Sequence, residues 1–308
     1  TNPINVDFNA DVVEGPIHVI KAEELREALK TMKRGKAAGP TGLTSEIILE
    51  AGDVGFQHLL SICQEFWNTA VMPKDWCSST TVPLYKGKGD PLNCASYRGI
   101  RLLEHGLKII EKVIHRRLLG LLKIGNYQYG FMAGKSTIDA IFIIRQLQEK
   151  FCAKKLKLYH IFVDLEKAFD RVSRKAIVWS LRRQFVPERL IELIMAMYHH
   201  TATAVCTPCG VTSEFNINAG VHQGSILSPL LFITVMEEVT KSIRSNDYCE
   251  LMYADDIVLT EPSEEQVARR FVTWKNQLTD HGLKINIDKT KVLVTGKRNE
   301  PVLRGRWP

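Results

Sequence analysis

Two adjacent acids, Asp255 and Asp256, end the tetrapeptide Tyr-Ala-Asp-Asp at 253–256. Apolar residues flank this tetrapeptide on both sides. A third acid, Asp164, directly follows the apolar run Ile-Phe-Val at 161–163. Carboxylates are ligands that a hard cation such as Mg²⁺ prefers. A pair of such ions promotes phosphoryl transfer, because one activates the attacking hydroxyl and the other stabilises the leaving group. The acids therefore predict metal-dependent phosphoryl transfer.

A solvated turn is the alternative interpretation of Asp255 and Asp256, because Asp is common in turns. Taken alone, the tetrapeptide supports both interpretations about equally. Asp164 favours the metal site, since clustered carboxylates without a cation repel one another by several kcal/mol at an effective protein dielectric of about 20.

The alternation of side chains along a strand refines the expected roles of the acids. Successive strand residues point to opposite faces, so Asp255 and Asp256 cannot both face one ion unless the turn reorients one of them. We expect Asp164 and Asp255 to be the main metal ligands and Asp256 to be a secondary ligand. The backbone carbonyl of Leu165 is a candidate for an additional oxygen ligand.

Secondary-structure patterns place these acids on a sheet. The segment 250–252, in which the apolar Leu251 and Met252 follow Glu250, and the apolar run 257–259 predict a tight β-hairpin with the acids at its tip. The segment 161–164 predicts a buried strand. Further strands are expected at 79–86, 97–103, 202–206, 211–219, 283–287 and 291–295. Helices are expected at 22–33, 45–70 with a break at 52–55, 107–122, 136–151, 173–184, 187–198, 228–243 and 264–281.

Length and composition indicate a chain that is long enough for a large core and that has a polyanionic partner. The chain has 308 residues, long enough for two subdomains, and a net charge of +7. Basic residues gather in the glycine-punctuated run at 33–42 and on the rim of the hairpin at 79–103. Both clusters suit phosphates, although a solvated basic loop or a charge-protected sheet edge explains them equally well.

The cysteines and the hydropathy pattern favour an intracellular protein. The seven cysteines form no disulfide framework, and Cys206 and Cys209 make a lone CxxC that predicts unpaired thiols more than a zinc site. No apolar run reaches the length of a membrane span, and no signal peptide is visible, so we expect no membrane partner.

Four motifs, in order, resemble the A, B, C and D palm motifs of reverse transcriptases. They are Phe-Val-Asp-Leu-Glu-Lys-Ala-Phe-Asp at 162–170, Gly-Val-His-Gln-Gly-Ser-Ile-Leu-Ser-Pro-Leu at 220–230, Tyr-Ala-Asp-Asp at 253–256 and Gly-Leu-Lys-Ile-Asn with Lys-Thr-Lys at 282–291. Upstream, residues 96–103, 128–131 and 134–137 resemble the fingers of non-LTR retrotransposon (LINE) enzymes of the RTE type. The resemblance covers residues 33–295.

This resemblance implies roles for particular residues. Asp164, Asp255 and Asp256 match the catalytic acids of the family. Phe169 matches the steric gate that excludes a ribose 2′-OH, although without the family a core role would be favoured for this ring. Many LINE enzymes have Asp at the position of Thr41, Pro at that of Gly99 and Arg at that of Met132. The contacts that the fingers make are therefore expected to differ from the family pattern at these three positions.

Nucleotide contacts follow from the same resemblance. Gln223 and Gly224 match residues that support the incoming nucleotide, and Lys86 and Arg98 are candidates for gripping its triphosphate. Lys289 matches a region credited with protonating the leaving pyrophosphate, with a solvated lysine as the alternative. Mg²⁺, as two ions, is the expected cofactor, and Mn²⁺ is an expected substitute.

The resemblance also implies a fold and a domain order. We expect an α+β right-hand polymerase with fingers and a palm, whose antiparallel sheet is backed by helices, and a missing or truncated thumb. Residues 1–32 would be an N-terminal extension, 33–157 mainly fingers, 158–295 mainly palm, with part of 173–220 packing with the fingers, and 296–308 a C-terminal tail.

The expected function is RNA-directed DNA polymerisation for the replication of a retrotransposon. The expected partners are an RNA template, a DNA primer or nicked target DNA, and deoxynucleoside triphosphates, with endonuclease and thumb regions in a parent polyprotein. The site of action would be the nucleus for target DNA and the cytoplasm for assembly with element RNA. A catalytically inactive nucleic-acid-binding remnant and an RNA-synthesising polymerase are the alternatives.

Overall fold

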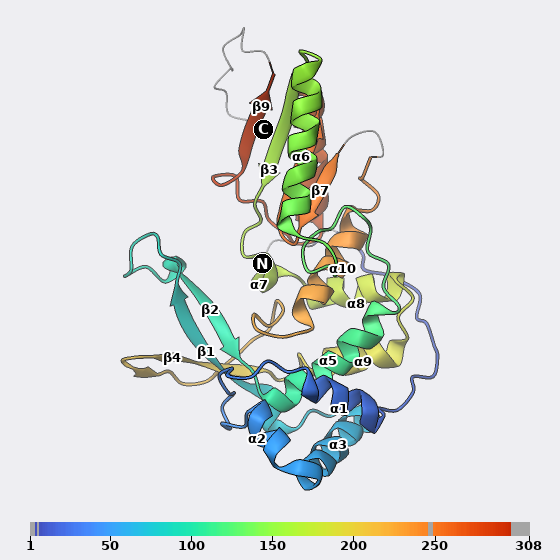
Figure 1. Cartoon of the computed structure of the whole chain (residues 1–308), viewed down its shortest axis with the longest axis vertical. Coiled ribbons are helices and arrows are strands. Elements are labelled where there is room, and N and C mark those ends of the chain that lie inside the picture. The colour runs from blue at the N-terminus through green and yellow to red at the C-terminus, as the bar shows by residue number, and fades with distance from the viewer. Residues whose placement is uncertain (1–3, 5, 246–248, 297–308) are drawn as a thin grey trace. The chain divides into compact units, whose positions relative to one another are not determined.

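The computed structural model describes residue 4, residues 6–245 and residues 249–296, and its chain forms two compact units (Figure 1). Unit 1 takes its described residues from 1–9, 123–180 and 229–308. Unit 2 consists of residues 10–122 and 181–228. All three acids of the sequence analysis belong to unit 1, and the basic hairpin belongs to unit 2.

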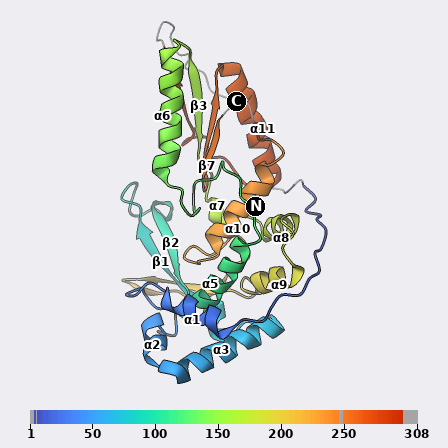
Figure 2. The ribbon, with the colours of Figure 1, turned by 45° about the vertical axis from the view of Figure 1, so that its right-hand side comes forward.

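Unit 1 contains a four-stranded antiparallel sheet in the order β7-β8-β3-β9. The strands are β3 (Leu158–Val163), β7 (Glu250–Tyr253), β8 (Asp256–Glu261) and β9 (Lys291–Thr295). Helices α6 (Thr137–Ala153) and α11 (Glu264–Asp280) run along the sheet, as Figure 2 shows. The short helix α7 (Ala168–Arg171) follows β3, and α10 (Ser228–Thr240) precedes the hairpin of β7 and β8.

Helix α11 anchors the sheet through one apolar face. Its N-cap Ser263 accepts a hydrogen bond from the Gln266 N–H, which satisfies one of the free donors of the first turn. The buried side chains recur at helical spacing and are Val267, Phe271, Trp274 and Leu278. Burial of each such side chain contributes roughly 1.5–3 kcal/mol. The strand ends that carry the acids therefore rest on a packed layer.

Unit 2 contains a second sheet, in the order β2-β1-β4-β5 with β6 paired to β4. Strands β1 and β2 are antiparallel, and β1 and β4 are parallel. The strands are β1 (Ser78–Tyr85), β2 (Tyr97–Leu102), β4 (Ala202–Thr207), β5 (Gly210–Val211) and β6 (Phe215–Asn216). The helices are α1 (Ala22–Lys30), α2 (Ser45–Glu50), α3 (Gly52–Thr69), α4 (Lys74–Cys77), α5 (His105–Leu119) and α9 (Glu188–Ala196), and a 3-10 turn lies at Cys94–Ser96. Helix α8 (Arg174–Arg183) spans the chain boundary between the units.

Most of the expected elements are confirmed, but two strands and one helix break are wrong. The break expected at 52–55 is absent, because α2 ends at Glu50 and α3 begins at Gly52, so residues 52–55 are helical. The strand expected at 283–287 is a single antiparallel bridge between Leu165 and Ile285. The strand expected at 211–219 is reduced to the two-residue strands β5 and β6. Apolar alternation alone does not supply a pairing partner, and a strand lasts only as far as its neighbour continues. The assignment of residue ranges to fingers, palm and extension stays a prediction, and the tail beyond residue 296 lies outside the described residues.

Within the part of the chain that the structure describes, no helix is both long and apolar enough to cross a membrane.

Candidate active site

The pairing of β3 with β8 brings the acids of distant segments together. The last pair of this ladder is Val163 with Ile257, so Asp164 and Asp256 lie one residue beyond it on neighbouring strands. Opposed residues of an antiparallel pair have Cα atoms roughly 4.5–5.5 Å apart. On the other side of the hairpin, Tyr253 pairs with Asp256, which leaves Ala254 and Asp255 as the two turn residues. The expected hairpin and its neighbouring acid are therefore present.

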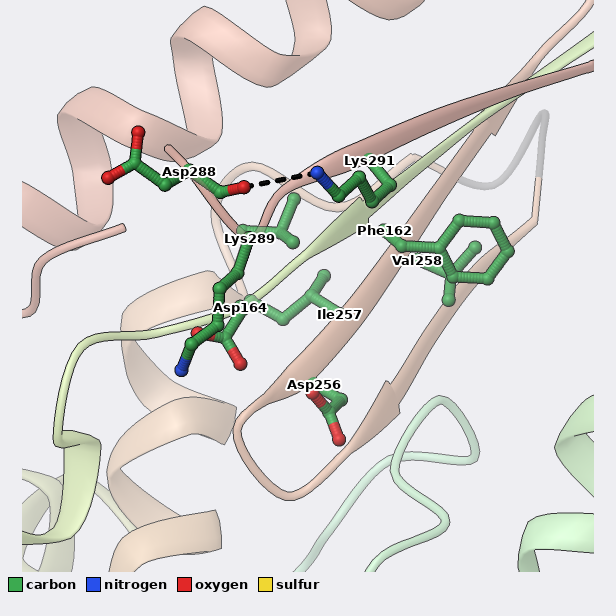
Figure 3. A pocket seen from close by; sticks show the side chains of 9 residues that line it. Phe162, Asp164, Asp256, Ile257, Val258, Asp288, Lys289 and Lys291 are labelled. Carbon is green, nitrogen blue, oxygen red and sulfur yellow. Dashed lines mark hydrogen bonds and ion pairs between the residues drawn. The ribbon is translucent and has the colours of Figure 1, made fainter. Parts of the chain in front are cut away.

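A pocket of about 610 Å³ opens at these strand ends. Figure 3 shows Asp164 and Asp256 on neighbouring strands of this pocket, with Lys289 reaching toward Asp164. The lining residues are Phe162, Val163, Asp164, Asp256, Ile257, Val258, Asp288, Lys289 and Lys291. Asp164 and Asp256 thus line the pocket together, whereas Asp255 is a residue of the turn.

The acids and Lys289 form one electrostatic group. The Lys289 ammonium lies 3.3 Å from Asp164 Oδ2. Partial burial raises the pKa of Asp256, as do the negative charges of Asp255 and Asp164, while Lys289 opposes the rise. A carboxylate that its neighbours make harder to ionise is one that a bound cation would stabilise.

The donor set fits a divalent cation that shares its coordination with a substrate. Among the described residues, no three His, Cys, Asp or Glu side chains are arranged as a ready-made metal site. Mg²⁺ is typically held by one or two carboxylates together with phosphate oxygens and water, and does not require a complete protein cage. Asp164 and Asp256 in the pocket, with Asp255 beside them, match that requirement.

The bridge after β3 fixes the backbone beside Asp164. The Asn286 N–H donates to the Asp164 carbonyl at 2.8 Å, and the Glu166 N–H donates to the Lys284 carbonyl at 2.8 Å. These two bonds leave the Leu165 carbonyl outside the bridge. Its role as an oxygen ligand stays a prediction.

Phe169 lies on α7, a few residues after Asp164, and contacts two aromatic rings of unit 1. Its ring stacks on Phe232 with centroids 4.7 Å apart, and Phe131 approaches it edge-on at 6.2 Å. Phe169 is half-buried. The ring is therefore held by packing and keeps part of its surface exposed, and its role as a steric gate stays a prediction.

Gln223 and Gly224 lie in unit 2, on a loop bound to the end of β2. The Arg101 N–H donates to the Gln223 carbonyl at 2.8 Å. Gly224 has a φ of 121°, and a Cβ at this position would lie 2.4 Å from the Arg101 carbonyl oxygen. Glycine is thus required both by the backbone conformation and by the close approach.

Lys86 and Arg98 lie on the β1–β2 hairpin of unit 2 and are both exposed. Lys86 Nζ donates to the Ala95 carbonyl at 2.8 Å. Their proposed contacts with a triphosphate, like those of Gln223 and Gly224, stay predictions, because the acids belong to the other unit.

The departure at Thr41 has a local explanation within unit 2. The Thr41 N–H and hydroxyl donate to the two carboxylate oxygens of Glu104 at 2.8 and 2.7 Å. Gly39 of the same loop packs so closely that a Cβ would lie 2.5 Å from the carboxylate. An Asp at position 41 would meet this buried carboxylate with like charge.

Two polar residues, Glu111 and Gln128, have structural roles that the sequence did not predict, although Gln128 belongs to the motif at 128–131. Glu111 on α5 is buried and accepts hydrogen bonds from the Ser225 hydroxyl at 2.6 Å and the Ile226 N–H at 2.9 Å. Gln128 is also buried and accepts from the Ala254 N–H at 2.9 Å. The position of Glu111 on the apolar face of a predicted helix could have indicated a buried, hydrogen-bonded carboxyl group. Nothing in the sequence indicated that Gln128 would bond to Ala254.

Comparison with known proteins agrees with this geometry. Residues 86–302 match the family model described as reverse transcriptase (RNA-dependent DNA polymerase). The chain is similar to the RNA-directed DNA polymerase from mobile element jockey of Drosophila melanogaster, with 26% identity over 82% of this chain and 28% of the relative. It is also similar to the Pol polyprotein from the type-1 retrotransposable element R2 of Popillia japonica, with 26% identity over 92% of this chain and 42% of the relative.

These relatives come from non-LTR retrotransposons, and the chain spans less than half of their length. Among solved structures, apo telomerase from Candida tropicalis, truncated from the C-terminal domain, superposes with a TM-score of 0.55 at 15% identity. The match covers 80% of this chain and 56% of that chain, and it concerns the fold alone. The expected fold class, an α+β right-hand polymerase with an antiparallel sheet backed by helices, is confirmed.

Proposed function

The chain belongs to the reverse transcriptase (RNA-dependent DNA polymerase) family, and from that premise we propose that it extends a DNA 3′ end on an RNA template by phosphoryl transfer from deoxynucleoside triphosphates. The observation that carries this proposal is the pairing of β3 with β8, which brings Asp164 to the Tyr-Ala-Asp-Asp hairpin in one pocket. Polymerisation is the chemistry for which the family combines these acids.

The three acids are the proposed holders of the catalytic cations. Asp164, Asp255 and Asp256 would bind two Mg²⁺ ions, with Mn²⁺ as a substitute and the Leu165 carbonyl as a further oxygen. Bound metal would supply charge neutralisation at the attacking and leaving oxygens. The carboxylates hold that charge in place, and Lys289 lies near enough to Asp164 to deliver a proton at the same pocket.

The remaining roles concern the nucleotide. Phe169 excludes a 2′-hydroxyl by steric overlap, since its ring is held against Phe232 and cannot easily move aside. The Gln223 side chain and the Gly224 backbone support the nucleotide, because the loop that carries them is fixed to β2. Lys86 and Arg98 bind the triphosphate through their charge.

We further propose an RTE-type non-LTR retrotransposon as the source of the chain. The relatives named above are longer mobile-element proteins, which supports a longer parent polyprotein, and we propose that its other parts provide an endonuclease and a thumb. Its partners would be element RNA and nicked target DNA, with action in the nucleus and assembly in the cytoplasm. The net charge of +7 supports a nucleic-acid partner.

A primer-extension assay tests the proposed function. The chain is incubated with an RNA template, an annealed DNA primer, deoxynucleoside triphosphates and Mg²⁺, and the matched reactions contain a DNA template or ribonucleoside triphosphates. We expect extension on RNA with deoxynucleotides. Binding of the primer-template without extension at any protein concentration would instead identify an inactive remnant, and preferential use of ribonucleotides would identify an RNA-synthesising polymerase.

A further inference from the structure

The segment at 127–130 of unit 1 lies along the edge strand of the acid hairpin. The Tyr129 N–H donates to the Met252 carbonyl and the Met252 N–H donates to the Tyr127 carbonyl, both at 2.8 Å. Gln128 forms a parallel bridge with Met252 between these bonds. The backbone of Gln128 is thus fixed next to Met252 of β7, and Met252 lies two residues before Ala254, the first residue of the turn.

The side chain of Gln128 continues from this edge to the turn itself. Gln128 is 1% exposed, and its Oε1 accepts hydrogen bonds from the Gly130 N–H at 2.8 Å and the Ala254 N–H at 2.9 Å. The two N–H donors fix the orientation of the amide, because only its oxygen can accept both bonds. The second bond holds the first residue of the catalytic turn.

Ala254 needs such a restraint because its backbone is strained. It has a φ of 57°, in the left-handed region that residues with a Cβ rarely adopt. Ala254 is buried, so water does not replace a lost partner of its N–H. The Gln128 oxygen therefore stabilises a conformation that sets the direction of the next two residues, Asp255 and Asp256.

The amide nitrogen of Gln128 indicates that packing alone does not account for a glutamine at this buried position. Its Nε2 is buried and has no hydrogen-bond partner among the described residues. A buried unpaired donor is unfavourable, and an apolar side chain of similar size would fill the same space without that cost. The two bonds that Oε1 accepts are what this glutamine adds.

Gly130 makes a second close contact with the same turn. A Cβ on Gly130 would lie 2.4 Å from the Ala254 nitrogen and 2.9 Å from the Tyr253 carbonyl carbon. The segment at 127–130 therefore lies against the backbone of the turn, and any side chain at 130 would displace it.

We propose that Gln128 is a positioning residue for the polymerase reaction. Its side-chain oxygen fixes the Ala254 N–H, and through it the Asp255 and Asp256 carboxylates, beside Asp164. Gln128 does not touch substrate in this role. The inference rests on the proposed function for its kinetic consequence, whereas the restraint on the turn is testable without activity.

Amide hydrogen exchange of the full chain tests the restraint directly. The variants are Gln128→Leu, which removes the acceptor, and Gln128→Glu, which keeps an acceptor oxygen. The control is Gln277→Leu, which removes a glutamine of the same unit whose Nε2 donates to the Val239 carbonyl at 2.9 Å, away from the turn. We expect exchange at Ala254 to become about tenfold faster or more in Gln128→Leu, and to remain near the parent rate in Gln128→Glu and Gln277→Leu.

Steady-state primer extension then tests the consequence. We expect Gln128→Leu to lower kcat by about tenfold or more while KM for the nucleotide changes less than about threefold, and Gln128→Glu to recover most of the loss. The half-saturating Mg²⁺ concentration should rise in Gln128→Leu. Unchanged Ala254 exchange, or faster exchange with unchanged kcat, would overturn the proposal.

A second pair of variants covers the case in which Gln128→Leu does not fold. Gly130→Ala should displace the turn and give the same fall in kcat, while Gly15→Ala, where a Cβ meets nothing within 4 Å, should not. Equal activity of Gly130→Ala and Gly15→Ala would contradict the inference. A parent chain that extends no primer would refute the proposed function instead, and the exchange rates would still decide whether Gln128 restrains the turn.

Discussion

The Lys289 ammonium lies 3.3 Å from Asp164 Oδ2, so the acid that directly follows β3 has a cationic neighbour in its pocket. This lysine follows the bridge between Leu165 and Ile285, which ties the last motif to the first. The contact explains how a residue 125 positions away in sequence reaches the catalytic carboxylate.

Replacement of Lys289 tests whether this lysine donates a proton in the reaction or is only a solvated side chain. A general acid contributes about 10²–10⁴ in rate, so we expect Lys289→Ala to lower the rate of nucleotide addition by about a hundredfold. The matched control is Lys284→Ala, because Lys284 pairs with Glu166 at 3.0 Å on the same bridge. Single-turnover kinetics measure the rate of nucleotide addition by both variants. If both variants lower this rate only slightly and to the same extent, Lys289 is a solvated lysine.

Truncation of Phe169 tests the steric gate. Phe169→Ala removes the ring that stacks on Phe232, so a 2′-hydroxyl no longer meets a fixed wall. We expect the ratio of deoxynucleotide to ribonucleotide incorporation efficiency to fall by about tenfold to a hundredfold, equivalent to about 1.4–3 kcal/mol. Phe142→Ala, at an exposed position of α6, is the control. Retained discrimination in Phe169→Ala would assign that ring to the core alone.

Glu111 should make the stability of the chain depend on pH. Burial raises the pKa of Glu111 to about 7 from an ordinary 4.5, although the hydrogen bonds from Ser225 and Ile226 oppose the rise. The folded chain therefore holds this proton more tightly than the unfolded chain does. The corresponding stabilisation is complete below the ordinary pKa and is lost as the pH rises through the folded pKa.

In the variant Glu111→Gln the side chain at 111 is neutral at every pH, so the variant does not lose this stabilisation as the pH rises. We expect the free energy of unfolding of the parent, relative to that of Glu111→Gln, to fall by on the order of a few kcal/mol between about pH 5 and about pH 8. Urea unfolding at several pH values measures the difference. A difference that does not change with pH would show that Glu111 keeps its ordinary pKa in the folded chain.

The local parts of the site were predictable from the sequence, and its supports were not. The hairpin of β7 and β8 follows from apolar runs that flank a two-residue turn, since the pattern and the turn are both local. Glu111 bonds to a loop 114 residues away, and Gln128 bonds to a turn 126 residues away. No periodicity within a segment specifies such partners.

The wrong strand at 283–287 has a related cause. Leu283 and Ile285 are buried in alternation, as a strand pattern requires, but the chain pairs with the Asp164–Glu166 segment at one point only. Beyond it, the Thr290 N–H donates to the Asn286 carbonyl at 3.0 Å and the chain turns toward β9. The alternating pattern is present at Leu283 and Ile285, but Ile287 is exposed and the pattern did not reveal how short the pairing is.

The metal-binding role of the hairpin acids is tested most directly by the rate of primer extension in Mg²⁺ by Asp255→Asn, compared with the rate by Asp288→Asn. Asp288 lines the same pocket but has no assigned role, so its variant controls for the loss of one negative charge. We expect Asp255→Asn to lose activity by about a thousandfold or more, and Asp288→Asn to stay within about threefold of the parent. Extension by Asp255→Asn at a rate near that of the parent would contradict the central claim that the hairpin acids hold the catalytic metal.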